Sequence, residues 1–209
     1  MKILFYGDSI TDAGRNYTML HGEEAMGKGY VKYAAAGLKE RGFTDEDLIN
    51  RGISGNRIVD LYARIKLDCW NHQPDFLSIL IGVNDIWHEL VIQNGVELDR
   101  FEKMYRILIE DTKKVLPNIK IMLCEPFVLE GAATNEKWEQ FLDVYKYAAV
   151  VKKLAEEYGL YFLPLQEKLS QAMANGVENV LSDGVHPAKA GAEIIASEWL
   201  KKFDEIQNA

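Results

Sequence analysis

The sequence contains very little cysteine. Its 209 residues include only Cys69 and Cys124, each in an apolar or helical-looking segment and without the spacing of a metal-ligand set. We therefore expect two buried free thiols in preference to a disulfide, although the sequence alone leaves a disulfide open. No cluster of His or Cys residues offers a metal site, so we expect neither a metal nor a cofactor.

Long apolar runs and an excess of positive charge are also missing. No run of 18 apolar residues occurs, and only four apolar residues separate Lys2 from Gly7, so we expect neither a membrane-spanning helix nor a signal peptide. The net charge of −8 and the pI near 5.1 disfavour nucleic acid or an anionic membrane as a partner. We expect a cytoplasmic protein with neither kind of partner.

Repeats, low-complexity segments and linkers are absent as well. Apolar residues make up 48% of the chain and charged residues 27%, which is the composition of a globular protein. The length fits one domain, and we expect a single domain over residues 1–209.

What the sequence does contain is a regular alternation of strand-like and helix-like segments. Five strands are expected at about 2–7, 47–50 with Ile53, 76–81, 119–124 and 160–163. Helices are expected at 30–41, 56–69, 97–116, 136–158, 165–174 and from about Pro187, with long loops at 12–29 and 128–135. This alternation predicts an α/β fold with a parallel sheet and helices on both of its faces.

Chemically useful residues follow the predicted strands. Ser9 comes after the first strand, Gly55 after the second, Asn84 after the third, and Asp183 and His186 after the fifth and one helix. The carboxyl ends of parallel strands share one edge of a sheet, where ligands bind. A serine hydroxyl needs a base such as imidazole, an acid can orient that imidazole, and N–H groups can stabilise the oxyanion of acyl transfer. This inventory predicts a serine hydrolase.

Simpler explanations exist for each residue. Ser9 could cap the turn after its strand, Asn84 could form an Asx-turn, and Asp183 with His186 could cap the last helix. Three other histidines are expected at the surface or in loops: His21, His72 and His88.

Four blocks in order resemble those of the SGNH-hydrolase family, also called GDSL esterases and lipases. The blocks are Gly7-Asp8-Ser9-Ile10, Gly52 to Asn56, Gly82-Val83-Asn84-Asp85 and Asp183-Gly184-Val185-His186-Pro187. The resemblance implies Ser9 as the nucleophile, His186 as the base and Asp183 as its partner. It also implies oxyanion donors at Ser9, Gly55 and Asn84. The implied fold is a three-layer α/β/α sandwich whose five-stranded parallel sheet is flavodoxin-like in order.

A narrower resemblance is to the family's intracellular carbohydrate acetyl esterases, such as acetylxylan esterases. It rests on Asp8 to Arg15, Gly29-Tyr30-Val31, Asn50 to Asn56 and Asn84 through Trp87. It implies hydrolysis of short-acyl, acetyl esters on carbohydrate, with Asp8 as a substrate-binding candidate. Trp87 is a second candidate, because it lies one turn from Asn84 and could stack on a sugar ring. Trp87 could equally belong to the core. The polar loops 12–29 and 128–135 are expected to flank the site without an apolar lid.

Other functions fit less well. A flavodoxin-like phosphate binder would not place Asp8 and Asp12 in its first loop, and the chain has no Gly-rich phosphate motif. An α/β-hydrolase would need Gly-x-Ser-x-Gly, which is missing. A lipase or lysophospholipase, a broad arylesterase, and a catalytically silent carbohydrate-binding protein remain alternatives. A homo-oligomer is also open.

Overall fold

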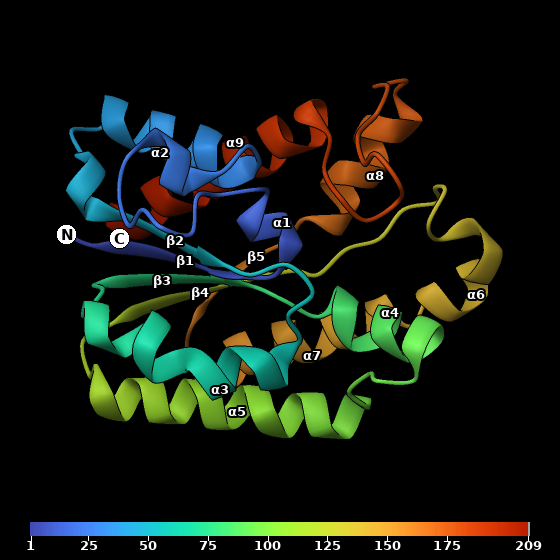
Figure 1. The fold of residues 1–209 in the computed structure, drawn as a ribbon, viewed down its shortest axis with the longest axis horizontal. Coiled ribbons are helices and arrows are strands. Elements are labelled where there is room, and N and C mark those ends of the chain that lie inside the picture. Colours follow the sequence, from blue (N-terminus) through green and yellow to red (C-terminus); the bar gives the residue numbers. More distant parts are fainter. Residues whose placement is uncertain (209) are drawn as a thin grey trace.

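Five parallel strands form one sheet in the order β2-β1-β3-β4-β5 (Figure 1). The structure is a computed structural model that describes residues 1–208. The strands are β1 (Ile3–Gly7), β2 (Leu48–Gly52), β3 (Phe76–Leu80), β4 (Lys120–Cys124) and β5 (Tyr161–Leu163). The predicted strands and the flavodoxin-like order are confirmed.

Strands β1 and β3 lie in the middle of the sheet and are buried throughout. They pair with each other from Ile3 opposite Phe76 to Gly7 opposite Leu80. A strand covered by helices on both faces has apolar side chains on both faces. This explains why β1 and β3 are recognisable in the sequence as short, largely apolar runs. The chain order reverses between these two strands, and a sheet of this kind opens a crevice at that point.

Helices cover both faces of the sheet, so the predicted three-layer sandwich is confirmed (Figure 1). One face carries α2 (Tyr30–Glu40), α8 (Gln166–Ala174) and α9 (Lys189–Gln207), and the other carries α3 (Ile58–Asp68), α5 (Leu98–Val115) and α7 (Val144–Glu157). The shorter elements are α1 (Ser9–Asp12), α4 (Val83–Ile92), α6 (Trp138–Phe141) and the 3-10 turns Glu23–Met26, Asp45–Asp47, Trp70–His72 and Asn135–Lys137.

The core beneath α9 is aromatic. Trp199 stacks on Phe203 with ring centroids 5.2 Å apart, and both rings lie against Phe76 of β3. The Trp199 ring N–H donates to the Ser78 hydroxyl at 2.9 Å, so the buried polar atom has a partner. This packing fixes α9, and with it the loop that precedes α9.

The helices differ from the prediction at two places. The predicted helix over 136–158 is broken between α6, which ends at Phe141, and α7, which begins at Val144, and Phe141 packs edge-on against Trp87. A helix at Val83–Ile92 was not predicted at all, because its first turn was interpreted only as a chemical motif.

Cys69 and Cys124 are both buried and free, as predicted. Burial raises the pKa of each thiol to about 12. Among residues 1–208, no helix is both long and apolar enough to cross a membrane.

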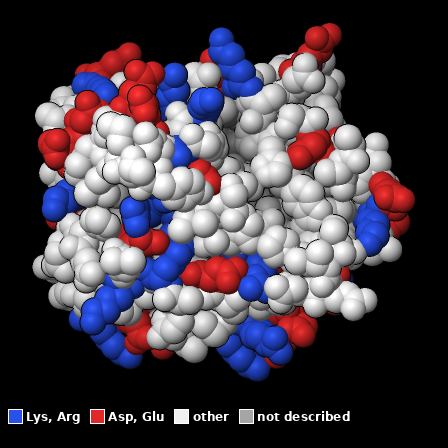
Figure 2. Space-filling view, in the orientation of Figure 1, with Lys and Arg blue, Asp and Glu red and all other residues white. Residues whose placement is uncertain are grey.

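The two ends of the described chain lie at the amino edge of the sheet (Figure 1). The terminal ammonium of Met1 lies 3.5 Å from a carboxylate oxygen of Asp47, just before β2. The Lys120 ammonium, at the start of β4, donates to the carbonyl of Ile206 in the last turn of α9 at 3.4 Å. Figure 2 shows acidic and basic side chains interspersed on one face of the molecule, without a large area of one sign.

Candidate active site

Three side chains from opposite ends of the chain form a hydrogen-bonded chain. The Ser9 hydroxyl lies 2.9 Å from Nε2 of His186, and Nδ1 of His186 lies 2.7 Å from Oδ2 of Asp183. When Nδ1 carries the ring proton and donates a hydrogen bond to the carboxylate, Nε2 is left free to accept from the serine. The arrangement can therefore take a proton from Ser9 as its oxygen attacks an electrophile.

Ser9 is presented by the sharp turn at the end of β1. It is the first residue of α1, and the Asp8 carboxylate caps this short helix by accepting from the backbone N–H of Ile10 at 2.9 Å. Gly7 has no room for a side chain, because a Cβ there would collide with the carbonyl of Leu80 and the hydroxyl of Thr11. Glycine thus lets the chain turn tightly and bring Ser9 to the sheet edge.

Asp183 and His186 lie in a loop that is held by hydrogen bonds from its backbone N–H groups to the Asp183 side chain. Oδ1 of Asp183 accepts from the backbone N–H groups of Val185 and His186 at 2.9 and 2.8 Å. Partial burial raises the pKa of Asp183, but these two bonds and the His186 ring outweigh it, so that the pKa is lowered overall. The carboxylate therefore stays ionised and keeps the imidazole in place.

Gly55 and Asn84 face Ser9 across the same cleft. Gly55 follows β2 in a left-handed conformation with φ of +78°, which glycine adopts without strain. Asn84 lies in the first turn of α4, and its amide donates one N–H to the carbonyl of Asn56 at 3.0 Å. A side-chain amide has two N–H donors, so the second can serve an oxyanion in the cleft.

The cleft has a volume of about 480 Å³, and one face of α4 forms a wall of it. Its lining residues are Ser9, Ser54, Gly55, Asn84, Trp87, His88, Val91, Ile92 and His186. The spacing from Asn84 to Ile92 is that of one helical face, so this wall could have been found from the sequence once a helix had been recognised there.

The surroundings of the site differ from the expectation in detail. His88, expected at the surface or in a loop, lies on α4 and lines the cleft beside Gly55. The loops 12–29 and 128–135 lie beside the site, where Asp12 accepts from Ser54 and Ala133 N–H donates to the carbonyl of Asp183, but the wall of the cleft comes from α4. Trp87 does line the cleft, with its ring 5.7 Å from that of His186.

Asp8 does not fit the substrate-binding role predicted for it. Its side chain is only 1% exposed and is engaged in capping α1. Burial raises its pKa to about 7, against the lowering effects of the Ile10 N–H and of His186. Burial also raises the pKa of Asp85, next to Asn84, well above its usual range. Two buried carboxyl groups therefore lie directly behind the site.

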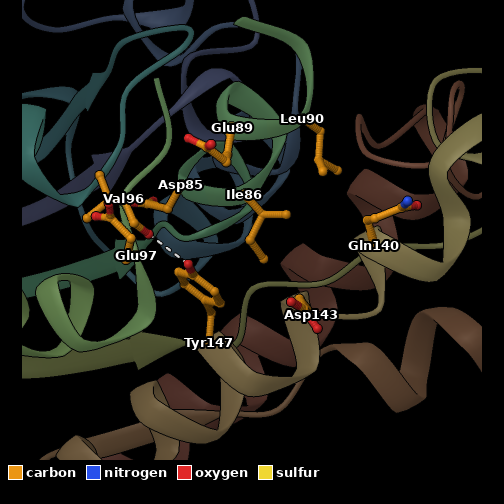
Figure 3. A pocket seen from close by; sticks show the side chains of 9 residues that line it. All are labelled: Asp85, Ile86, Glu89, Leu90, Val96, Glu97, Gln140, Asp143 and Tyr147. Carbon is orange, nitrogen blue, oxygen red and sulfur yellow. Dashed lines mark hydrogen bonds between the residues drawn. The ribbon is translucent and has the colours of Figure 1, made fainter. Parts of the chain in front are cut away.

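A second cavity, of about 230 Å³, opens beside α4 (Figure 3). Asp85 and Ile86 of α4 line it together with Tyr147 of α7, whose hydroxyl donates to the carbonyl of Val96 at 2.7 Å. Neither Ser9 nor His186 reaches it. Within residues 1–208 no three His, Cys, Asp or Glu side chains gather in a way that could hold a metal ion.

Comparison with known proteins agrees with this geometry. The GDSL-like Lipase/Acylhydrolase family matches the chain over residues 5–194. The chain belongs to this family. A GDSL/SGNH hydrolase of this kind is a carboxylic ester hydrolase, and the predicted resemblance is confirmed.

Named relatives lie within the same family. The acetylxylan esterase of Geobacillus stearothermophilus is 36% identical over 210 residues, which cover 97% of this chain and 93% of that enzyme. Its crystal structure superposes with a TM-score of 0.83, covering 96% of this chain and 93% of that one. A structure from Parabacteroides merdae, described as a GDSL-like lipase, has a TM-score of 0.89 at 38% identity and covers 97% and 94%.

Three further structures of the Geobacillus esterase are of catalytic mutants. They replace a serine, an aspartate and a histidine by alanine. These are the residue types that meet in the cleft of this GDSL hydrolase.

Proposed function

We propose that this GDSL esterase works through Ser9, His186 and Asp183. The observation that carries the proposal is the unbroken path from the Ser9 hydroxyl through His186 to Asp183, with distances of 2.9 and 2.7 Å. His186 removes the proton as Ser9 Oγ attacks the ester carbonyl, and ionised Asp183 stabilises the resulting imidazolium.

The tetrahedral intermediate needs donors for its negative oxygen. Under the proposal the backbone N–H groups of Ser9 and Gly55 and the Asn84 amide supply them. The imidazolium then gives its proton to the leaving alcohol, and the carbon–oxygen bond breaks to leave an acyl group on Ser9. Water, deprotonated by His186, attacks that acyl group and releases the acid with free Ser9.

The proposed substrates are short-acyl esters, in particular acetyl esters of carbohydrates. Support comes from the relative named acetylxylan esterase, which matches almost the whole chain. Trp87 adds physical support, because its half-buried ring lies beside His186, where the leaving alcohol must receive its proton. An indole ring can stack on the apolar face of a sugar.

A longer acyl group is the second candidate, since α4 ends in apolar side chains at the cleft. Val91 and Ile92 are 64% and 60% exposed there. Each buried methylene contributes about 0.8 kcal/mol, so an acyl chain lying along them would favour longer esters steeply. This is the broad esterase or lipase alternative, and it uses the same three residues.

The test combines a variant with a substrate series. Ser9→Ala should lose activity by on the order of 10⁴-fold or more while its circular dichroism spectrum is unchanged. For the unaltered protein, kcat/KM on aryl acetate, butyrate and octanoate should fall in that order, and peracetylated xylose oligomers should release acetate. Preference for octanoate would select the second candidate. Near-normal turnover by folded Ser9→Ala, or sugar binding without any turnover, would refute the serine mechanism.

A further inference from the structure

One guanidinium group, that of Arg64 on α3, contacts the ends of β1 and β2 and the loop after β2. Its NH2 donates to the carbonyl of Gly7 at 3.1 Å, and its NH1 donates to the carbonyl of Arg51 at 2.8 Å. Its Nε donates to the side-chain oxygen of Asn56 at 2.7 Å. The first two carbonyls belong to the carboxyl ends of β1 and β2, and Asn56 lies in the loop after β2.

Two of these contacts, those with Gly7 and Asn56, lead to the three proposed oxyanion donors. Gly7 lies two residues before Ser9, and Asn56 directly follows Gly55. The backbone carbonyl of Asn56 in turn accepts from the Asn84 amide at 3.0 Å. A displacement of the Arg64 side chain would therefore shift all three donors. It would move the N–H groups of Ser9 and Gly55 through the backbone, and the Asn84 amide through the carbonyl of Asn56.

Arg64 itself is held firmly. Its side chain is only 14% exposed, its NH1 pairs with Asp68 one turn later at 2.8 Å, and its guanidinium lies 4.3 Å from the centre of the Tyr6 ring. The Tyr6 hydroxyl donates to the carbonyl of Leu61 at 2.7 Å, which fixes the ring against α3. A planar group with five donors suits three acceptors in fixed directions, whereas a lysine ammonium cannot reproduce this fork.

We propose that Arg64 is a positioning residue that sets the geometry of the oxyanion hole. The proposal rests on the proposed function, because it assigns Arg64 a task in that same site. Arg64 does not line the cleft and does not contact substrate. It acts by keeping the Gly55 N–H and the Asn84 amide at the distance at which they stabilise the transition state, where small misplacements of catalytic groups are costly.

Arg51 provides a matched control. It pairs with the other carboxylate oxygen of Asp68 and is 19% exposed, close to the exposure of Arg64. Among the hydrogen bonds of the described chain, its side chain bonds to Asp68 and to none of the cleft-forming segments. Arg51→Met and Arg64→Met thus both remove an ion pair with Asp68, but only the second removes the contacts to Gly7 and Asn56.

The experiment measures kcat and KM on an aryl acetate for Arg64→Met, Arg64→Lys, Arg51→Met and Asn56→Ala, with urea unfolding of each variant. Arg64→Met should lower kcat by about 30- to 100-fold with KM changed less than about threefold, because an oxyanion contact acts in the transition state. Asn56→Ala should lower kcat by about tenfold, and the two changes should be less than additive in the double variant. Arg64→Lys should recover only part of kcat, and Arg51→Met should stay within about threefold of the unaltered protein.

Several results would overturn the proposal. Equal losses in Arg64→Met and Arg51→Met would reduce Arg64 to a stabilising residue, and an effect confined to KM would remove it from the transition state. If Arg64→Met does not fold, Arg64→Lys and Asn56→Ala replace it as the test. Unchanged kcat in both of these variants would also refute the positioning role. Ser9→Ala, measured alongside, distinguishes a failure of the proposed function from a failure of the role of Arg64. Normal activity of Ser9→Ala would refute the proposed function. An inactive Ser9→Ala together with normal activity of the Arg64 variants would refute only the role of Arg64.

Discussion

The two halves of the candidate site are built in different ways. The half that carries Gly55 and Asn84 is attached to strand ends and braced by side chains from distant parts of the chain, such as Arg64 and Asp12. Asp12, for example, accepts from the backbone and the hydroxyl of Ser54 at 3.0 and 2.7 Å. The half that carries Asp183 and His186 is a loop held mainly by backbone hydrogen bonds.

That second half is also the more exposed one. The side chains of His186 and Asp183 are 37% and 29% exposed, whereas Asn84 is 4% exposed. The segment before His186 is tied to the loop after β4, since Ala133 N–H donates to the carbonyl of Asp183 at 2.8 Å and Leu129 N–H to that of Gly184 at 2.9 Å. We call the half with Gly55 and Asn84 the oxyanion half and the half with Asp183 and His186 the base half. The oxyanion half is held in place mainly by particular side chains, whereas the base half is held mainly by backbone hydrogen bonds.

Removing the imidazole of His186 should have the largest effect on activity. His186→Ala should lower kcat by on the order of 10⁴-fold or more, because no other group of the described chain lies within hydrogen-bond reach of the Ser9 hydroxyl to take its proton. His72→Ala is the control, since His72 does not line the cleft and its carbonyl accepts from the ammonium of Lys2 at the amino end of β1, and it should keep normal turnover. Comparable kcat values for the two variants would exclude His186 as the base.

The corresponding change in the oxyanion half should cost less. Asn84→Ala should lower kcat by about 10²–10³-fold with a smaller change in KM, because the amide acts mainly on the transition state. Steady-state kinetics on a short ester measures both quantities. A change seen only in KM would show that Asn84 binds the ground state instead.

A backbone change should affect the base half alone. A Cβ on Gly131 would collide with the backbone of Asp183 and Gly184, so Gly131→Ala should shift this loop and lower kcat by roughly tenfold. Gly176→Ala is the control: its φ of +81° makes alanine strained, but its Cβ would meet nothing within 4 Å. Gly176→Ala should lose about 1 kcal/mol of stability through backbone strain and keep its activity, whereas Gly131→Ala should lose activity and at least as much stability. Equal kcat values would show that the loop tolerates the shift.

The smallest expected effect concerns Asp8, which lies between the halves. Its pKa of about 7 in the folded protein exceeds the ordinary value of 3.8, so the folded state binds more protons than the unfolded state between these pH values. The contribution of Asp8 to stability should therefore fall as the pH rises from about 4 to about 7. Asp8→Asn should flatten this fall and gain on the order of 1–3 kcal/mol at pH 8, measured by urea unfolding. An unchanged pH profile would mean that Asp8 is ionised in the fold.

Much of this architecture could be predicted because its signals are local. The run from Ile3 to Gly7 is apolar and ends at a glycine, and the same holds for the strand that ends before Gly82. Parallel topology then places the residues after these strands at one edge, which is why Ser9 and Asn84 were expected to face a common site.

The remainder depends on contacts that no local pattern contains. Phe141, where the predicted helix is broken, packs on Trp87, over 50 residues away in the chain. In the sequence, Arg64 cannot be distinguished from other charged residues of an amphipathic helix. Its contacts with Gly7 and Asn56 exist only in the folded protein. Asp8 was expected near substrate from the family resemblance, but its carboxyl is buried and accepts from the backbone N–H of Ile10.

The placement of the chain ends has a practical consequence for attaching this protein to a surface. The residues near both ends contact the amino edge of the sheet, whereas the cleft follows the carboxyl ends of the strands (Figure 1). A tether joined to either end would therefore leave the cleft facing the bulk solution, and polymeric substrates could approach it without passing the support. We expect immobilised and free protein to hydrolyse small and polymeric esters in the same ratio.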